Sequence, residues 1–414
     1  MQVTNARIRG RDGLWTIGIE GDTIASLTPA GDGAQASQGD FDAEGRLVCP
    51  QFLENHVHLD YANTAGVPRV NDSGTLFEAI EIWGERKAQG LQNRDQILAN
   101  AREAARSLAS HGVGYIRSHV DVTDPELTAF DALLELREEI KPWCHLELIA
   151  FPQNGVYAYP GGDKLMRTAM ERGADVVGGI PHLEPTREDG VRSVQYLFDL
   201  AEEFGARLDI HCDEIDDEQS RFVEVMAAET TKRGMQGRVT VAHAVAMGYY
   251  NPGYMAKLLP KLKEAGLGFV INPKENLQLQ GRGFGQPVPR GVAPIRDLDD
   301  LGLPVAFGQD SMVDPWYPLG DGDLVDVLDV ALHVGHMLTP AYLDRALDFL
   351  TLHPATNFGL ADRYGIEEGR LASLLVLDAA DDTAVVRTHP DVLLSVHEGR
   401  EVLRRVPAQT TWAL

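Results

Sequence analysis

Cysteine is scarce in this sequence, and long apolar runs are absent. The 414 residues include three cysteines, Cys49, Cys144 and Cys212, and no CxxC pair. This spacing forms neither an even disulfide framework nor a cysteine-rich zinc site, so we expect reduced thiols and a cytoplasmic location. A membrane helix needs roughly 18 consecutive apolar residues, and no such stretch occurs. The first residues also lack the apolar segment of a signal peptide.

Basic residues are in deficit as well. Lys and Arg number 37 against 62 Asp and Glu, which gives a formal net charge of −25. A chain with this charge repels phosphate backbones, so nucleic-acid binding is not expected. The zinc signature of nucleic-acid-editing deaminases, H-x-E followed by P-C-x-x-C, is also absent. The hydrophobic content of 44% is ordinary for a globular protein with a large core.

No glycine fingerprint for a dinucleotide follows the first buried strand, which argues against a doubly wound sheet. Instead, apolar strand candidates alternate with helical segments such as residues 95–111 and 191–204. The eight strand candidates span residues 47–55, 113–119, 145–151, 175–181, 207–211, 239–243, 268–272 and 304–309. Eight such units over roughly 300 residues predict an α/β protein built on a (β/α)8 barrel.

Both ends of the chain read as short strands. Residues 14–19 and 23–27 alternate in polarity across a tight turn and predict a hairpin. Near the other end, residues 371–378, 383–388 and 392–396 are also typical of strands. We therefore expect residues 1–48 and 365–414 to build one small β-sandwich domain, and residues 49–364 to form the barrel.

Histidines and one aspartate stand where barrel strands end. His56 and His58 are two apart, so in extended backbone they face the same side. The other members are His211, His243 and Asp310, each at the end of a different strand candidate. A single buried histidine is usually a hydrogen-bonded core residue, but functional side chains in a barrel come from these strand ends. Imidazoles with a carboxylate predict one divalent ion, Fe²⁺ or Zn²⁺.

Glu214 follows His211 by three residues, in the turn beyond the strand. A divalent ion lowers the pKa of its bound water towards about 7, which makes hydrolytic attack on a polarised carbon the expected reaction. Glu214 is placed to take the water proton and pass it to a substrate nitrogen. The acids at 216–218 are better explained as the first turn of a helix over residues 218–232.

The chain resembles the amidohydrolase superfamily and, within it, the bacterial cytosine deaminases, over nearly its whole length. The matching segments are residues 56–60 (HVHLD), 118–124 (SHVDVTD), 150–153 (AFPQ), 174–182 (ADVVGGIPH), 211–222 (HCDEIDDEQSRF), 276–282 (NLQLQGR) and 314–320 (DPWYPLG). Agreement over so many segments is not a chance event. The resemblance implies a deaminase that acts on a free pyrimidine base and that is commonly a homo-oligomer.

The resemblance also implies roles for individual residues. The metal ligands match His56, His58, His211 and Asp310. The catalytic residues match Glu214 as proton shuttle, His243 as the hydrogen-bond partner of the metal-bound water, and Asp310. The substrate-binding residues are Gln153, which matches the amide that reads the ring carbonyl and its neighbouring N–H, Ser311, and Trp316 as a pocket wall. His119 and Asp121 either support the metal ligands or have purely structural roles, and the two alternatives are weighed equally.

One position departs from the family. The cytosine deaminases read His-Asp-Asp where this chain has Gln309, Asp310 and Ser311. Loss of the second carboxylate removes a charge-assisted hydrogen-bond partner and frees its volume. The pocket is then open to 5-methylcytosine, while cytosine remains an equal possibility.

Two other functions are kept beside this one. A hydrolase of another amino- or N-alkylamino-substituted ring, such as isocytosine or an aminotriazine, would share the same metal site. A non-catalytic metal-binding barrel is disfavoured because Glu214 stands with the complete ligand set.

Overall fold

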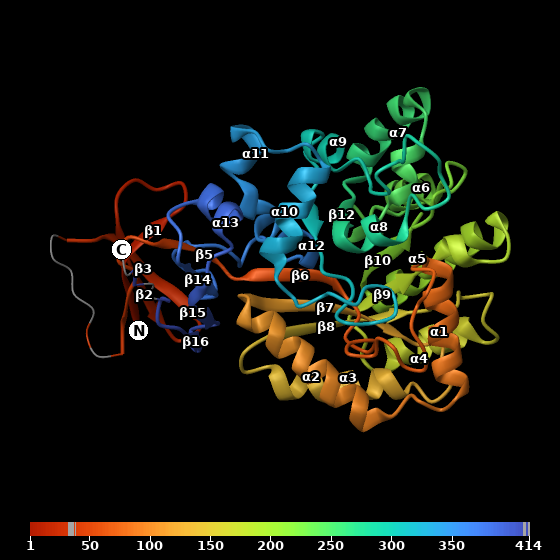
Figure 1. Ribbon diagram of the computed structural model, residues 1–414, viewed down its shortest axis with the longest axis horizontal. Helices are drawn as coiled ribbons and strands as arrows, with labels where there is room; N and C mark the ends of the chain where they lie inside the picture. Colours follow the sequence, from red (N-terminus) through yellow and green to blue (C-terminus); the bar gives the residue numbers. More distant parts are fainter. Residues whose placement is uncertain (32–36, 38, 409–410, 413–414) are drawn as a thin grey trace.

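Eight parallel strands form the barrel at the centre of the molecule (Figure 1). The computed structural model describes residues 1–31, 37, 39–408 and 411–412. The barrel strands are β6 (Phe52–Val57), β7 (Val113–Asp121), β8 (His145–Phe151), β9 (Val176–Gly179), β10 (Arg207–Cys212), β11 (Val239–His243), β12 (Gly268–Ile271) and β13 (Val305–Phe307). Each pairs in parallel with the next along the chain, as the eight strand candidates predicted.

The barrel closes between its first and last strands. The His58 amide donates to the Asp310 carbonyl (3.0 Å), and the Asp310 amide donates to the His56 carbonyl (2.8 Å). Val57 and Asp310 form the corresponding parallel bridge. The predicted (β/α)8 fold is therefore confirmed, and its closing hydrogen bonds lie on the residues that the sequence singled out as metal ligands.

Helices pack around the barrel. They are α1 (Leu76–Ala88), α2 (Arg94–Ser110), α3 (Thr128–Ile140), α4 (Gly162–Arg172), α5 (Arg187–Phe204), α6 (Phe222–Arg233), α7 (Pro252–Ala265), α8 (Pro273–Leu279), α9 (Ile295–Asp300), α10 (Leu324–Val334), α11 (Pro340–Leu343) and α12 (Leu352–Phe358). The Asn93 side chain caps α2, and the buried residues of this helix recur every three or four positions from Ile97 to Leu108. Within the described ranges, no helix is long and apolar enough to cross a membrane.

A second sheet combines strands from both ends of the chain. Its strands are β1 (Gln2–Ile8), β2 (Trp15–Glu20), β3 (Thr23–Pro29), β4 (Phe41–Asp42), β5 (Leu47–Pro50), β14 (Leu374–Leu377), β15 (Val392–His397) and β16 (Arg400–Arg404). The order is β16-β15-β14-β5-β1-β2-β3, with β4 beside β1. The predicted hairpin is present as β2 and β3, and Figure 1 places this small β-domain at one side of the barrel.

Two details of the prediction were wrong at these ends. Residues 383–388 belong to helix α13 (Asp382–Thr388) and not to a strand, because Asp381 caps the segment by accepting from the Ala384 amide (2.7 Å). The strand candidate at 47–55 is two strands, β5 in the small sheet and β6 in the barrel. The exact domain limits at 48 and 365 stay a prediction.

Candidate active site

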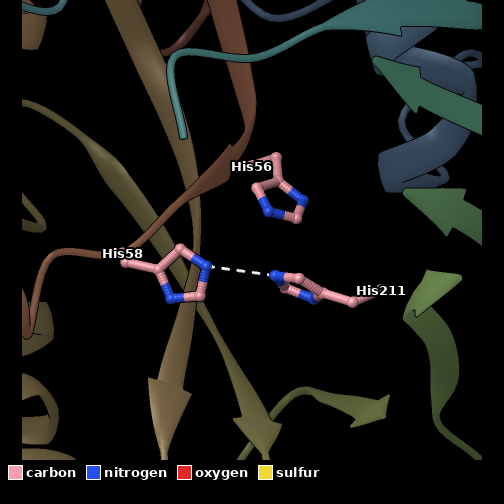
Figure 2. Close-up of side chains that lie close together, drawn as sticks. All are labelled: His56, His58 and His211. Atoms are coloured by element: carbon pink, nitrogen blue, oxygen red, sulfur yellow. Dashed lines mark hydrogen bonds between the residues drawn. The ribbon is translucent and has the colours of Figure 1, made fainter. Parts of the chain in front are cut away.

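Three histidine rings converge at the carboxyl end of the barrel (Figure 2). His56 and His58 come from β6 and the residue after it, and His211 from β10 across the barrel. The Nε2 atoms of His58 and His211 are 3.1 Å apart. One ring nitrogen of each of the three lies within 4.8 Å of the others, a spacing that suits ligands of one metal ion.

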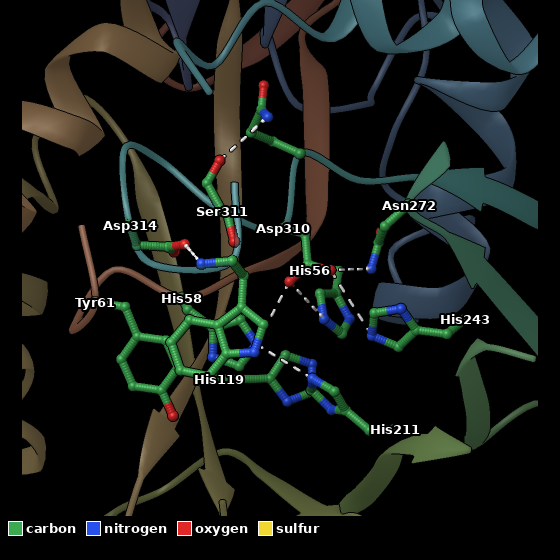
Figure 3. Close-up of polar contacts among 12 residues, drawn as sticks. His56, His58, Tyr61, His119, His211, His243, Asn272, Asp310, Ser311 and Asp314 are labelled. Carbon is green, nitrogen blue, oxygen red and sulfur yellow. Dashed lines mark hydrogen bonds and ion pairs between the residues drawn. The ribbon is translucent and has the colours of Figure 1, made fainter. Parts of the chain in front are cut away.

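Asp310 completes this group. Its Oδ1 lies 3.4 Å from His56 Nε2 and 3.5 Å from His58 Nε2, and its Oδ2 accepts from Asn272 Nδ2 (3.0 Å) (Figure 3). The φ angle of Asp310 is 65°, in the left-handed region that non-glycine residues rarely adopt. Such strain, worth about 1–3 kcal/mol, concentrates at functional sites, where it directs a side chain.

Burial favours the neutral form of the histidines in this cluster. Burial lowers the pKa of both His56 and His58 to about 3, and it lowers the pKa of His211 well below that of a free histidine. Both ring nitrogens of His56 have no hydrogen-bond partner among the described residues. Neutral imidazole is the form that binds metals, and unpaired buried nitrogens cost stability unless a ligand occupies them. The donor set therefore fits a divalent metal.

Glu214 and His243 stand beside this cluster. His243 Nδ1 lies 3.4 Å from Glu214 Oε1, and its Nε2 lies 3.8 Å from Asp310 Oδ2. Asn276 on α8 reaches both partners, at 3.1 Å from His243 Nδ1 and 3.5 Å from Glu214 Oε1. Burial, followed by the charge of Asp310, raises the pKa of Glu214 well above its usual range. A carboxyl group with a raised pKa is suited to carrying a proton near neutral pH.

The segment after Glu214 differs from the prediction. Helix α6 begins at Phe222 and not at Glu218, and the acid at its start is Asp213, which accepts from the amides of Phe222 (2.9 Å) and Val223 (2.8 Å). Asp216 instead joins the loops after three strands, because it accepts from Tyr249 Oη (2.7 Å) and from the Gly281 amide (2.8 Å). These bonds hold the turn that carries Glu214.

The predicted substrate-binding residues line the same pocket as the metal cluster. The lining is His58, Tyr61, Leu76, Ile80, Gln153, Ile180, His182, Leu183, His211, Glu214, His243, Glu275, Asp310, Ser311 and Trp316. Trp316 stacks on Tyr61 with ring centres 5.0 Å apart, and Tyr61 stacks on His58 at 4.7 Å. The Tyr61 hydroxyl also donates to Gln153 Oε1 (2.7 Å). Tyr61 therefore orients both the pocket amide and the tryptophan wall.

Gln309 and Ser311, the two residues that depart from the family sequence, lie in different surroundings in the structure. Gln309 does not line the pocket: its Nε2 donates to the Ser311 carbonyl (3.2 Å), and its Oε1 accepts from the Gly322 amide (3.3 Å). Ser311 does line the pocket, where it lies beside the carboxyl groups of Glu275 and Asp314. Burial and then the charge of Asp310 raise the pKa of Glu275, an effect that a cation bound by Asp310 would offset.

The structure separates the roles of His119 and Asp121. The His119 ring lies 4.2 Å from the His56 ring and 4.4 Å from the His211 ring, centre to centre, directly behind the cluster. Asp121 accepts from Lys87 Nζ and Trp83 Nε1, both at 2.8 Å. Asp121 thus belongs to a network that ties α1 to β7.

Three pocket residues with polar side chains were missed at the sequence level: Tyr61, His182 and Glu275. A signal existed for His182, which follows β9 and is a histidine beyond a strand end, like the others. Tyr61 and Glu275 lie in a turn and in the short helix α8, where only the three-dimensional arrangement brings them to the pocket.

Comparisons with known proteins give one consistent picture. The family model described as "Amidohydrolase family" matches residues 85–403. A 5-methylcytosine deaminase from Klebsiella pneumoniae, solved with 5-fluorocytosine, superposes with a TM-score of 0.97 at 45% identity, over 100% of this chain and 99% of that chain. N-isopropylammelide isopropylaminohydrolase from Burkholderia multivorans superposes with a TM-score of 0.82 at 28% identity, over 97% and 98%. N-isopropylammelide isopropyl amidohydrolase of a Pseudomonas strain is 28% identical over 97% of this chain and 96% of that protein.

Proposed function

The chain belongs to the amidohydrolase family, and on that premise we propose that it is a metal-dependent hydrolytic deaminase of a free pyrimidine base. It is a hydrolase acting on C–N bonds of cyclic amidines. Its substrates are cytosine and 5-methylcytosine, and its products are uracil or thymine together with ammonia. The main support for this proposal is that Gln153, Glu214 and Ser311 line one pocket with the histidine cluster.

The ion is a divalent metal, which His56, His58, His211 and Asp310 would hold. When bound, such an ion activates water for attack at neutral pH. These ligands suit both Fe²⁺ and Zn²⁺, and we propose one ion of either kind per subunit.

Glu214 moves the protons of the reaction. It accepts a proton from the attacking water and donates it to the ring nitrogen next to the amine-bearing carbon. It then carries the proton of the added hydroxyl to the amino group, so that the C–N bond breaks, the carbonyl forms and ammonia leaves. His243 hydrogen-bonds the attacking water, with its ring held by Asn276 at 3.1 Å. Both side chains are buried, so competing bulk water is kept from the proton path.

Gln153 and Ser311 determine which ring is bound. Gln153 pairs with the ring carbonyl and the adjacent N–H, and the Tyr61 hydroxyl at 2.7 Å keeps its amide in a fixed orientation. Ser311 is smaller than the aspartate that the cytosine deaminases have there, so a methyl group at ring position 5 fits beside it. The 45% identity to a 5-methylcytosine deaminase supports the same assignment.

The test is ammonia release by the purified, metal-loaded protein from cytosine, 5-methylcytosine and isocytosine. We expect turnover of the first two, with 5-methylcytosine at least as good as cytosine. No ammonia from any of the three bases would refute the assignment.

The similarity to two N-isopropylammelide hydrolases favours one alternative, an amidohydrolase acting on an N-alkylamino-substituted triazine. Product identification from a panel of such rings separates the two, because only this alternative predicts release of an alkylamine. A cytoplasmic homo-oligomer remains our prediction for the assembly.

A further inference from the structure

Glu275 is a buried acid in the pocket that the reaction scheme above does not use. It lies on α8, is 2% exposed and lines the pocket beside Ser311. Its Oε2 has no hydrogen-bond partner in the part of the chain that the structure describes. A buried carboxylate oxygen without a partner costs stability, and in the pocket lining it is an acceptor that a bound ligand can satisfy.

Other buried acids near the site show what a structural role looks like. Asp121 pairs with Lys87 at 2.8 Å. Glu184 accepts from the backbone amides of three consecutive residues in the loop over 156–158. The charged groups that act most strongly on Glu275 are by contrast acids, namely Asp310, Asp314 and Glu214, and its pocket neighbour is Ser311.

Glu275 is placed to contact one edge of the bound pyrimidine ring. Gln153 follows β8, whereas Glu275 and Ser311 follow β12 and β13 on the opposite side of the barrel. If Gln153 holds the ring carbonyl, the opposite edge carries position 5 and the neighbouring amine-bearing carbon. Glu275 and Ser311 therefore meet the amino group and the substituent at position 5.

We propose that Glu275 is a substrate-binding residue whose carboxylate accepts a hydrogen bond from the amino group of the pyrimidine. This rests on the proposed function, since it assumes an aminopyrimidine held by Gln153. The carboxylate lost at position 311 is thus supplied from α8, at a place that leaves the space beside Ser311 open for a methyl group.

The proposal has a consequence for product release. An ionised carboxylate is an acceptor only. It attracts the amino group of the substrate and repels the carbonyl oxygen that replaces this group in the product. Glu275 therefore favours binding of 5-methylcytosine over thymine.

The experiment measures both affinities with turnover suppressed. The metal-loaded variant Glu214→Gln turns over slowly, so calorimetry on Glu214→Gln and on Glu214→Gln/Glu275→Gln, with ammonia assayed after each titration, gives dissociation constants for 5-methylcytosine and thymine. We expect the Glu275→Gln substitution to weaken the binding of 5-methylcytosine by about 10- to 100-fold, as for the loss of a hydrogen bond to a charged group. The affinity for thymine should stay unchanged or increase.

The control is Glu264→Gln on the same background, an exposed acid on α7 that should alter neither constant. Equal weakening of both ligands, or a lower thermal midpoint with both affinities reduced, would mean a structural role and overturn the proposal. So would unchanged affinities for both ligands. If the wild-type protein releases ammonia from neither base, the proposed function fails and the role of Glu275 with it.

Discussion

The strands β6 and β7 carry a buried polar cluster at each end, and the two clusters differ in their hydrogen bonds. At the starting end, Gln51 donates from Nε2 to Ser395 Oγ (2.8 Å) and pairs through Oε1 with His397 Nδ1 (2.9 Å), and the Tyr115 hydroxyl pairs with Ser373 Oγ (2.9 Å). At the carboxyl end, both ring nitrogens of His56 and of His119 lack a hydrogen-bond partner within the described residues.

Burial does not distinguish the ends, since all of these side chains are at most 3% exposed. What differs is whether the buried polar atoms have hydrogen-bond partners. In the first cluster, which joins the barrel to the small β-domain, the protein itself supplies these partners. In the second cluster, the missing partners are an ion and a substrate. Unpaired buried polar atoms, and not buried polar residues as such, mark the functional end of this barrel.

Removing the metal should have the largest effect, and only on the second cluster. We expect chelation to lower kcat/KM by about 10⁴-fold or more, because the ion supplies several kcal/mol of transition-state stabilisation. It should also lower the thermal midpoint, since an ion that binds the folded state stabilises it. Activity assays, metal analysis and thermal unfolding before and after addition of Fe²⁺ or Zn²⁺ measure both effects.

The matched variant for this prediction is His211→Ala, which should lose the metal without any chelator. Full activity in a chain shown to contain less than stoichiometric metal would contradict the assigned role of the cluster.

Replacing the proposed proton carrier should have the next largest effect. Glu214→Gln keeps the shape of the side chain but removes its proton transfer, so kcat should fall by about 10²- to 10⁴-fold. Metal content should remain at one ion per chain. Glu218→Gln, an exposed acid in the same loop, is the control and should be as active as the wild type. A Glu214→Gln enzyme with unaltered kcat would exclude this mechanism.

The functional end was predictable because it depends on local rules. Apolar strands alternating with helices indicate the barrel, and strand ends indicate where its functional residues lie. His56, His58, His211, His243 and Asp310 all follow from that single rule, and the structure brings them together.

The remainder depended on contacts between distant segments. Residues 383–388 are β-branched enough to suggest a strand, but they form a helix that Asp381 caps by accepting from the Ala384 amide. Asp216 looks like an acid at a helix start, yet it bonds to Tyr249 and Gly281 from two other loops. Glu275 carries no pattern of its own, since nothing local shows that α8 places it beside Ser311.

Breaking the starting-end cluster should change stability and leave catalysis intact. Gln51→Met has a similar size but leaves Ser395 Oγ and His397 Nδ1 without their Gln51 partner, so we expect a loss of about 1–3 kcal/mol in the free energy of unfolding. Urea unfolding measures the loss, and kcat/KM should stay within about twofold of the wild type. Gln96→Met, on the exposed face of α2, should cost less than about 0.5 kcal/mol. A large loss of activity in Gln51→Met would mean that the two ends are coupled.

The smallest effect is expected from pH at the same cluster. Burial lowers the pKa of His397 to about 4 from an ordinary value of 6.5. Between those two values the unfolded chain binds a proton that the folded chain does not, so this residue stabilises the fold above pH 6.5 and loses that contribution as the pH falls towards 4. His397→Gln retains a partner for Gln51 but cannot titrate, so its free energy of unfolding should fall less steeply than that of the wild type across this window. Parallel urea curves at pH 7, 6 and 5 test this. Identical pH profiles for the two proteins would show that His397 already titrates normally in the folded state, and that the starting-end cluster tolerates a charge.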